Sequence, residues 1–230
     1  MAEVKKKSKG SILVICAHSD DQIIGAGGAI AKYAKEGFDV HTIVLSFGEG
    51  VKPHLRREVI SRTRVKEAQK ADKIIGGSGV TFLGLKEMRF EDDFEKRGMA
   101  QNFVKILERF KPIKIFTHSS DDAHPDHRAA LRLVLKACNQ VKLNSDLYTF
   151  EVWHLLNLKK RNKPKLIIDT SETFKTKIKA LKAFKSQIDL SNFYNYLVLN
   201  NFLFFLVYVK DAFNGIKYNM KYAEVLYKIR

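Results

Sequence analysis

Cysteine and proline are scarce in this chain of 230 residues. Its two cysteines, Cys16 and Cys138, are too few for a disulfide scaffold, and we interpret them as buried thiols in a reducing compartment. Four prolines and thirteen glycines exclude a low-complexity tail rich in these residues. Hydrophobic residues make up 45% of the chain, which is enough for a packed core and excludes global disorder. We expect a single domain over residues 1–230, with residues 1–10 flexible.

Long apolar runs are also missing. The longest covers residues 202–209, far short of the roughly 20 residues that a membrane-spanning helix needs. We interpret it as the core of a buried strand or helix rather than a membrane contact. The apolar stretch behind the basic N-terminus, residues 12–17, is too short for a secretory signal. These absences predict a cytoplasmic protein.

Acidic residues are in deficit, since 25 Asp and Glu stand against 41 Lys and Arg, for a formal net charge of +16. Such an excess can attract nucleic acid, an anionic membrane or phosphorylated substrates. No nucleic-acid reader motif accompanies the charge, so we expect no specific nucleic-acid binding. A peripheral contact with an anionic membrane stays open. Five lysines at positions 175, 177, 179, 182 and 185 are predicted to decorate one helix, where a charge run is typically a solvated face.

Apolar, β-rich segments alternate with helical patterns along the chain. Strands are predicted at residues 11–17, 39–47, 80–83, 114–118, 148–154 and 166–170, and helices at residues 22–35, 56–75, 94–110, 125–137 and 173–187. This alternation predicts an α/β, Rossmann-like fold with a mostly parallel sheet and helices on both faces. Functional sites in such sheets lie at the carboxyl ends of the strands.

Two clusters of histidine and aspartate follow the first and fourth predicted strands. The first reads Ala-His-Ser-Asp-Asp and the second Asp-Asp-Ala-His-Pro-Asp-His. Imidazole and carboxylate are ligands for zinc, which in catalytic sites takes three protein ligands. His18 and Asp21 are three residues apart, as are His124 and His127, so each pair can point at one ion. Asp and Ser are also ordinary helix caps, but the two clusters together favour a metal site.

These motifs resemble those of the PIG-L/LmbE-type de-N-acetylase family. The family's Ala-His-Pro-Asp-Asp-Glu corresponds to Ala-His-Ser-Asp-Asp-Gln at residues 17–22, and its His-Pro-Asp-His is intact at residues 124–127. Ser19 therefore replaces a proline, and Gln22 replaces a glutamate. The resemblance extends over nearly the whole chain, with further matching segments at residues 25–28, 64–68, 82–85, 168–171, 179–180, 186–187 and 222–224. Residues 85–87, Leu-Lys-Glu, stand where the family often carries an aspartate.

The resemblance implies a role for each matching residue. Zinc or, as the alternative, Fe²⁺ would be bound, and amide hydrolysis would use a water whose pKa the ion lowers to about 7. The tetrahedral anion would be stabilised by zinc and a protonated His124. Either Asp20 or His124 would protonate the leaving amine. The implied roles are zinc ligand for His18, Asp21 and His127, general base for Asp20, oxyanion stabilisation for His124, orientation of a neighbouring imidazole for Asp126 and substrate contact for Arg64.

The resemblance implies a zinc-dependent hydrolase that removes the N-acetyl group from an N-acetylglucosamine-type sugar or conjugate, small or lipid-linked. Two alternatives stay open, namely a metal-dependent amidase for another amide conjugate and a non-catalytic basic binding module that retains the fold. Whether the chain forms a homo-oligomer cannot be read from the sequence. The glycines at residues 25–28 favour close helix packing over nucleotide binding. His118, at the end of the fourth predicted strand, is interpreted as either lining the site or structural.

Overall fold

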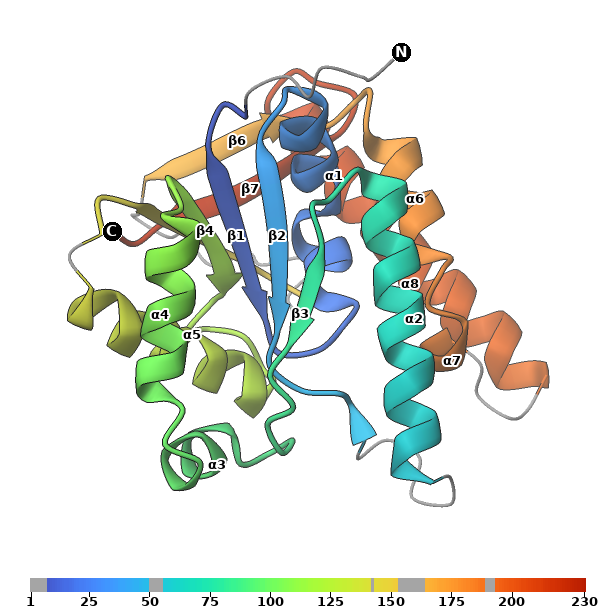
Figure 1. Cartoon of the computed structure of the whole chain (residues 1–230). Coiled ribbons are helices and arrows are strands. Elements are labelled where there is room, and N and C mark those ends of the chain that lie inside the picture. The colour runs from blue at the N-terminus through green and yellow to red at the C-terminus, as the bar shows by residue number, and fades with distance from the viewer. Residues whose placement is uncertain (1–7, 50–55, 142, 153–163, 189–192) are drawn as a thin grey trace, which may run out of the picture.

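The structure is a computed structural model that describes residues 8–49, 56–141, 143–152, 164–188 and 193–230 (Figure 1). Its strands are β1 Ser11–Cys16, β2 Asp39–Val44, β3 Val80–Phe82, β4 Lys114–His118, β5 Asp146–Phe150, β6 Lys165–Asp169 and β7 Ala223–Lys228. Its helices are α1 Asp21–Lys35, α2 Arg57–Ile75, α3 Phe90–Lys96, α4 Ala100–Phe110, α5 Pro125–Gln140, α6 Phe174–Leu181, α7 Lys185–Ile188 and α8 Phe193–Lys217.

The strands form one seven-stranded sheet in the order β3-β2-β1-β4-β5-β7-β6. Strands β1 to β5 are parallel, and β7 pairs antiparallel with both β5 and β6. The predicted mostly parallel sheet is therefore confirmed. The chain leaves β1 toward β2 on one side and returns to β4 on the other, which creates a switch point between β1 and β4. Ligands of open α/β sheets bind at such points.

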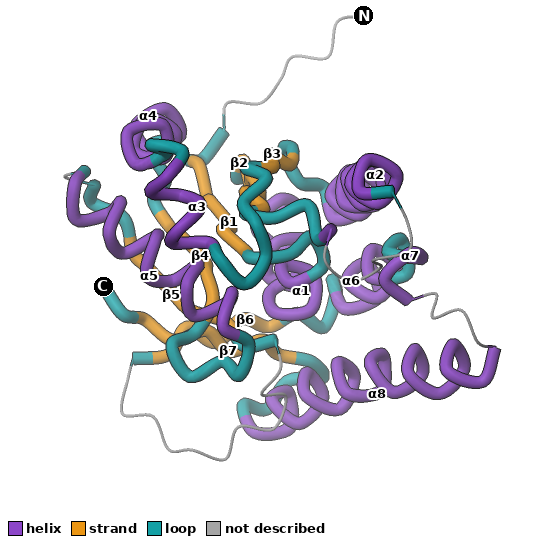
Figure 2. Tube along the Cα trace, turned by 90° about the horizontal axis from the view of Figure 1, so that it is seen from below, coloured by secondary structure: helices purple, strands orange, loops and turns teal. Residues whose placement is uncertain are grey.

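Both faces of the sheet are covered, as the strand pattern predicted. Ile12 and Val14 of β1 pack into a core with α1, α2, α6 and α8. Leu13 and Ile15, which point to the opposite face because side chains alternate along a strand, pack with α3, α4 and α5. The view in Figure 2 shows the two groups of helices on either side of the sheet. Among the described residues, no helix is both long and apolar enough to cross a membrane.

The glycines of α1 allow a close approach between this helix and the sheet. A Cβ atom on Gly25 would lie 2.2 Å from the ring of Phe150, and one on Gly28 would lie 2.7 Å from Thr170. Between them, Ala26 leaves helical geometry with φ −145° and ψ 18°, so α1 is broken. The packing prediction for these glycines is therefore confirmed.

Three local predictions were wrong. Residues 94–110 form parts of two helices, because Gly98 adopts φ +58° between α3 and α4. The helix predicted at residues 173–187 ends at Leu181, before the short α7. Lys177 is fully buried rather than on a solvated face.

Residues 202–209 belong to α8, which is consistent with one of the two predicted structures, but Phe202 and Phe205 are exposed rather than in the core. Residues 153 and 154, the end of another predicted strand, lie outside the described residues. Cys16 and Cys138 are buried free thiols, as predicted.

Candidate active site

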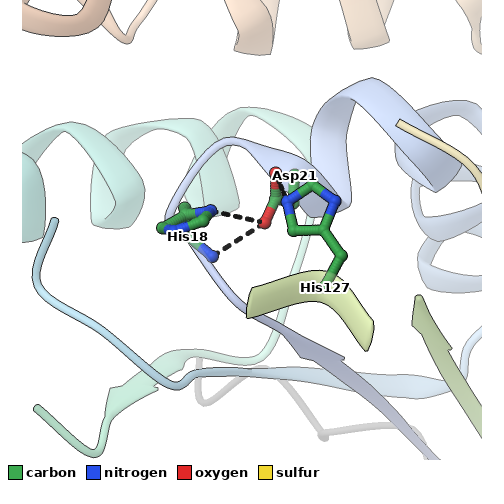
Figure 3. Close-up of side chains that lie close together, drawn as sticks. All are labelled: His18, Asp21 and His127. Atoms are coloured by element: carbon green, nitrogen blue, oxygen red, sulfur yellow. Dashed lines mark hydrogen bonds and ion pairs between the residues drawn. The ribbon is translucent and has the colours of Figure 1, made fainter. Parts of the chain in front are cut away.

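The turn between β1 and α1 places His18 and Asp21 side by side. Asp21 is the first residue of α1, and its Oδ2 atom accepts a hydrogen bond of 2.7 Å from the backbone N–H of His18. The same oxygen lies 3.4 Å from Nδ1 of the His18 ring. Figure 3 shows both contacts. The close spacing of the two residues, together with the start of α1, thus fixes the carboxylate next to the imidazole.

His127, in the first turn of α5, joins His18 and Asp21 from the other side of the switch point. Its ring is fully buried, and its Nε2 atom lies 3.3 Å from Oδ1 of Asp21 (Figure 3). One ligand atom from each of His18, Asp21 and His127 lies within 4.8 Å of the others, so the three could hold a metal ion. The structure brings together the three residues named as ligands from the sequence.

Asp122 holds the far side of the His127 ring, a role that the sequence prediction missed. Its Oδ1 atom lies 2.9 Å from Nδ1 of His127, and its carboxylate accepts the backbone N–H groups of His124 and Val152. Burial raises the pKa of Asp122, but His127 lowers it to about 2 overall. A carboxylate that pairs with Nδ1 leaves Nε2 directed at Asp21. Such partners orient histidine ligands and strengthen metal binding.

The Asp122→Asn variant is expected to bind zinc about 10- to 100-fold more weakly, because it loses the charge that orients and polarises the His127 imidazole. Competition with a metal chelator would measure this affinity. The matched control is Asp121→Asn, since Asp121 is the preceding aspartate but is exposed. Equal zinc affinity in the two variants would contradict the role given to Asp122.

His118 packs beneath the group and has a structural role. Its Nε2 atom accepts a hydrogen bond of 2.9 Å from the backbone N–H of Ala17, and its ring stacks on His127 at 3.9 Å. Burial and the charge of His127 lower the pKa of His118 to about 4. Since Nε2 accepts from the backbone, the neutral ring supports the loop after β1. The same Nε2 atom also lies 3.2 Å from Oδ2 of Asp21, so His118 lines the site as well as supporting it, and the contacts fit both interpretations left open by the sequence.

Asp20 and Arg64 lie on the same side of the site. Burial and the neighbouring Asp21 raise the pKa of Asp20 to about 6, while His18 and the Arg64 guanidinium act in the opposite direction. Arg64 of α2 is buried, and its guanidinium packs against Gly48, where a Cβ atom would lie 1.5 Å from Nη1. Gly48 also has φ +73°, so both the lack of space for a Cβ atom and the left-handed backbone conformation favour glycine at this position.

His124 and Asp126 form the start of α5. Nδ1 of His124 accepts a hydrogen bond of 3.2 Å from the backbone N–H of Asp126, which caps the helix. Burial and the neighbouring His18 and His127 lower the pKa of His124. Asp126 accepts the backbone N–H of Met88 and lies 3.4 Å from Nε2 of His18.

The departures from the family motif have local structural explanations. Gln22 is buried, and its amide donates to the carbonyl of Ser19 at 2.9 Å, while its Oε1 atom accepts from the thiol of Cys16 at 3.5 Å. Gln22 therefore ties the turn together. Glu87, after β3, brings its Oε1 atom to 3.8 Å from Nε2 of His18. A carboxylate thus reaches the site from the segment where the family often carries aspartate.

A charged cavity of about 340 Å³ adjoins the site at Glu87. Besides Glu87, its charged lining comprises Glu49, Arg57, Lys86 and Arg89. Its floor includes Ser46 and Gly84 at the ends of neighbouring strands. The cavity is large enough for a sugar-sized group.

Comparison with known proteins gives a consistent result. Residues 13–138 match the PIG-L family, described as GlcNAc-PI de-N-acetylase. The chain is 29% identical to the probable N-acetyl-alpha-D-glucosaminyl L-malate deacetylase 2 of Bacillus cereus, over 77% of this chain and 84% of the relative. It is 35% identical to the 4-oxalmesaconate hydratase of Pseudomonas putida, over 55% of this chain and 51% of that protein.

A solved structure has the same fold. The N,N'-diacetylchitobiose deacetylase from Pyrococcus horikoshii superposes with a TM-score of 0.75 at 20% identity, and the match covers 95% of this chain and 83% of that one. The family match covers more than half of this chain. The chain therefore belongs to the PIG-L family.

Proposed function

We propose that the protein is a metal-dependent deacetylase that hydrolyses the N-acetyl group of an N-acetylglucosamine-type sugar conjugate. The observation that carries this proposal is the group of His18, Asp21 and His127, whose ligand atoms lie within 4.8 Å of one another beside Asp20. The similarity to a deacetylase named for an N-acetylglucosaminyl malate supports the substrate class.

The residues of the site fit a divalent cation. Nε2 of the buried His127 faces Asp21 and makes no hydrogen bond within the described part of the chain. Burial alone would lower the pKa of both His18 and His127, but the surrounding carboxylates raise these pKa values to about 10 and about 9. The site therefore attracts positive charge. Two imidazoles and a carboxylate suit zinc and also Fe²⁺.

When bound, the ion would polarise the amide carbonyl and lower the pKa of a water to about 7. The protein's own groups then account for the movement of protons. Asp20, with a pKa near the working pH, can accept the proton of the attacking water and return it to the nitrogen as the C–N bond breaks, which yields acetate and a free amine. His124 accepts at Nδ1, so its neutral ring carries a proton at Nε2 that can donate to the oxyanion.

The charged cavity favours conjugates that carry an anionic group. Three cationic side chains, Arg57, Lys86 and Arg89, line it together with two acidic ones. Arginine binds carboxylate and phosphate groups through paired hydrogen bonds. We therefore propose that an N-acetylglucosamine conjugate with a carboxylate or phosphate is turned over in preference to a neutral one.

Metal analysis combined with acetate release tests the proposed function. Purified protein loaded with zinc would be assayed on neutral and anionic N-acetylglucosamine conjugates, and on 4-oxalmesaconate because one relative is a hydratase. We expect one zinc per chain, acetate from the sugar conjugates and faster turnover of the anionic ones. Absence of acetate together with hydration of 4-oxalmesaconate would overturn the proposed deacetylase function. Equal turnover of neutral and anionic conjugates at low salt would overturn only the proposed preference of the charged cavity for anionic groups.

A further inference from the structure

Helix α8 has an apolar side that the described chain leaves about half-exposed or more. Five large hydrophobic residues project from it, with exposed fractions between 49% and 80%; they are Phe202, Phe205, Tyr208, Phe213 and Ile216. At 100° per residue these positions fall within an arc of about 140° on one side of the helix. We call these five residues the α8 outer face. Between them, at the same side, lie Val209 and Ala212, so no charge interrupts the surface over about 21 Å.

The opposite side of α8 carries the charges. Asp211 is fully buried and accepts a hydrogen bond of 2.7 Å from Lys177 of α6. Lys210 is buried too, and its ammonium donates to the carbonyl of Glu151 at 2.7 Å. These contacts fix the rotation of the helix about its axis. Helix α8 thus buries Lys210 and Asp211 beside the core residue Val207, while it leaves large hydrophobic side chains exposed on its outer side, unlike an ordinary surface helix.

Exposed lysines surround the α8 outer face. Lys217 ends the helix, and Lys175, Lys182 and Lys221 line a hollow of about 630 Å³ together with Phe205 and Tyr208. Its remaining lining is Ser171, Phe174, Ile178, Phe204 and Tyr222, so no acidic residue is among the described residues that form it. Lys182 and Lys221 stand 6.0 and 5.9 Å from the ring centres of Phe204 and Tyr222.

We propose that the α8 outer face and its lysines dock the protein on an anionic lipid bilayer, with α8 lying in the plane of the interface. Aromatic side chains flanked by lysines suit the boundary between headgroups and acyl chains, and lysines near the surface are attracted by anionic headgroups. The net charge of +16 acts in the same direction. Figure 2 shows α8 along the outer margin of the molecule.

Charge complementarity favours a membrane over a second copy of the chain. In a symmetric dimer the same patch meets itself, so the four lysines of one copy would lie near those of the other. Like charges across an interface are unfavourable. An anionic bilayer places the opposite charge against the same lysines.

Vesicle flotation of the full chain tests the apolar part of the proposal. The probes are vesicles of phosphatidylcholine alone and of an equal mixture of phosphatidylcholine and phosphatidylglycerol. We expect binding to the mixed vesicles, and at least about a tenfold loss in the double variant Phe205→Ser, Ile216→Ser. Both residues are exposed, so the variant keeps its fold, and an unchanged thermal midpoint checks this. Val59→Ser, at an apolar position 52% exposed on α2, is the matched control and keeps full binding.

The role of the lysines is tested with two variants of equal net charge. The triple variant Lys175→Ser, Lys182→Ser, Lys221→Ser should bind the mixed vesicles about a hundredfold more weakly. The matched control removes the same number of charges by serine substitutions on α2, at Lys66, Lys70 and Lys73. These three lysines are exposed and lie far from α8 in the sequence, so the control should retain binding.

Three outcomes would overturn the proposal: no binding to mixed vesicles, equal loss in the test and control variants, or a dimer in sedimentation velocity that the Phe205→Ser, Ile216→Ser variant dissociates while vesicles bind neither form. None of these measurements uses deacetylase activity, so their failure is independent of the function proposed above.

Discussion

The Asp20→Asn variant is expected to lose about a thousandfold in kcat/KM for acetate release while it keeps its zinc. Asparagine is nearly isosteric with aspartate but cannot accept a proton from the attacking water. Asp20 suits this task because burial and the adjacent Asp21 raise its pKa to about 6, close to neutral pH. Initial rates on an N-acetylglucosamine conjugate, together with zinc content, would measure both effects.

Two further variants separate the loss of a base from the loss of the metal. His18→Ala removes one of the three grouped ligands, so it is expected to lose zinc and activity together. Asp121→Asn changes an exposed aspartate at the same edge of the sheet and should leave kcat/KM unchanged. If Asp20→Asn retained more than about a tenth of the wild-type rate, or lost its zinc, Asp20 would not be the general base.

The position of the site could be predicted because it depends on local rules. Apolar strands that alternate with helices predicted a mostly parallel sheet, and the carboxyl ends of parallel strands meet at one edge. His18 and Asp21 lie within one turn, and His127 lies within one turn of a helix that begins at Pro125. The spacing within each cluster therefore determined how its own side chains are placed relative to one another. The pairing of β1 with β4 then brings the two clusters together.

The supporting residues could not be read from the same patterns. Asp122 is two residues before His124 in a run of aspartates, and nothing in the spacing separates it from the exposed Asp121. The structure separates them, because Asp122 turns inward to Nδ1 of His127. Likewise His118 ends a strand, and only the hydrogen bond from Ala17 across the β1–β4 pair assigns it a structural role.

The surface charge pattern misled the sequence analysis at one helix. Five lysines between residues 175 and 185 were interpreted as a solvated face, yet Lys177 is fully buried, on the side of the helix opposite to Lys175 and Lys179. Its burial is possible because Asp211 and Glu224, which are 34 and 47 residues away in sequence, meet its ammonium. Long-range ion pairs of this kind have no local signature, so neither the partners of Lys177 nor the burial of charges on the inner side of α8 could be predicted.

Replacing Lys177 with methionine is expected to lower the free energy of unfolding by about 3–5 kcal/mol. The ammonium of Lys177 donates to Asp211 at 2.7 Å and to Glu224 at 2.6 Å, and all three side chains are buried. Methionine fills a similar volume but leaves two carboxylates in the core without their cation. For a chain of this length the thermal midpoint should fall by roughly 10 °C. Lys179→Met is the matched control, because Lys179 lies on the same helix but is exposed.

The same substitution should also weaken the site, because the buried ion pairs support α1. Glu224 accepts the backbone N–H groups of Gly28 and Ala29, at 2.9 and 2.7 Å, where the helix restarts after its break at Ala26. Asp21, one of the proposed metal ligands, stands at the start of this helix, so we expect a displaced Glu224 to loosen its position. Adding Asp211→Asn to Lys177→Met removes one of the two unpaired carboxylates and should recover part of the lost stability. An equal thermal midpoint for Lys177→Met and Lys179→Met, measured by circular dichroism, would show that the buried ammonium does not hold α1, α6 and α8 together.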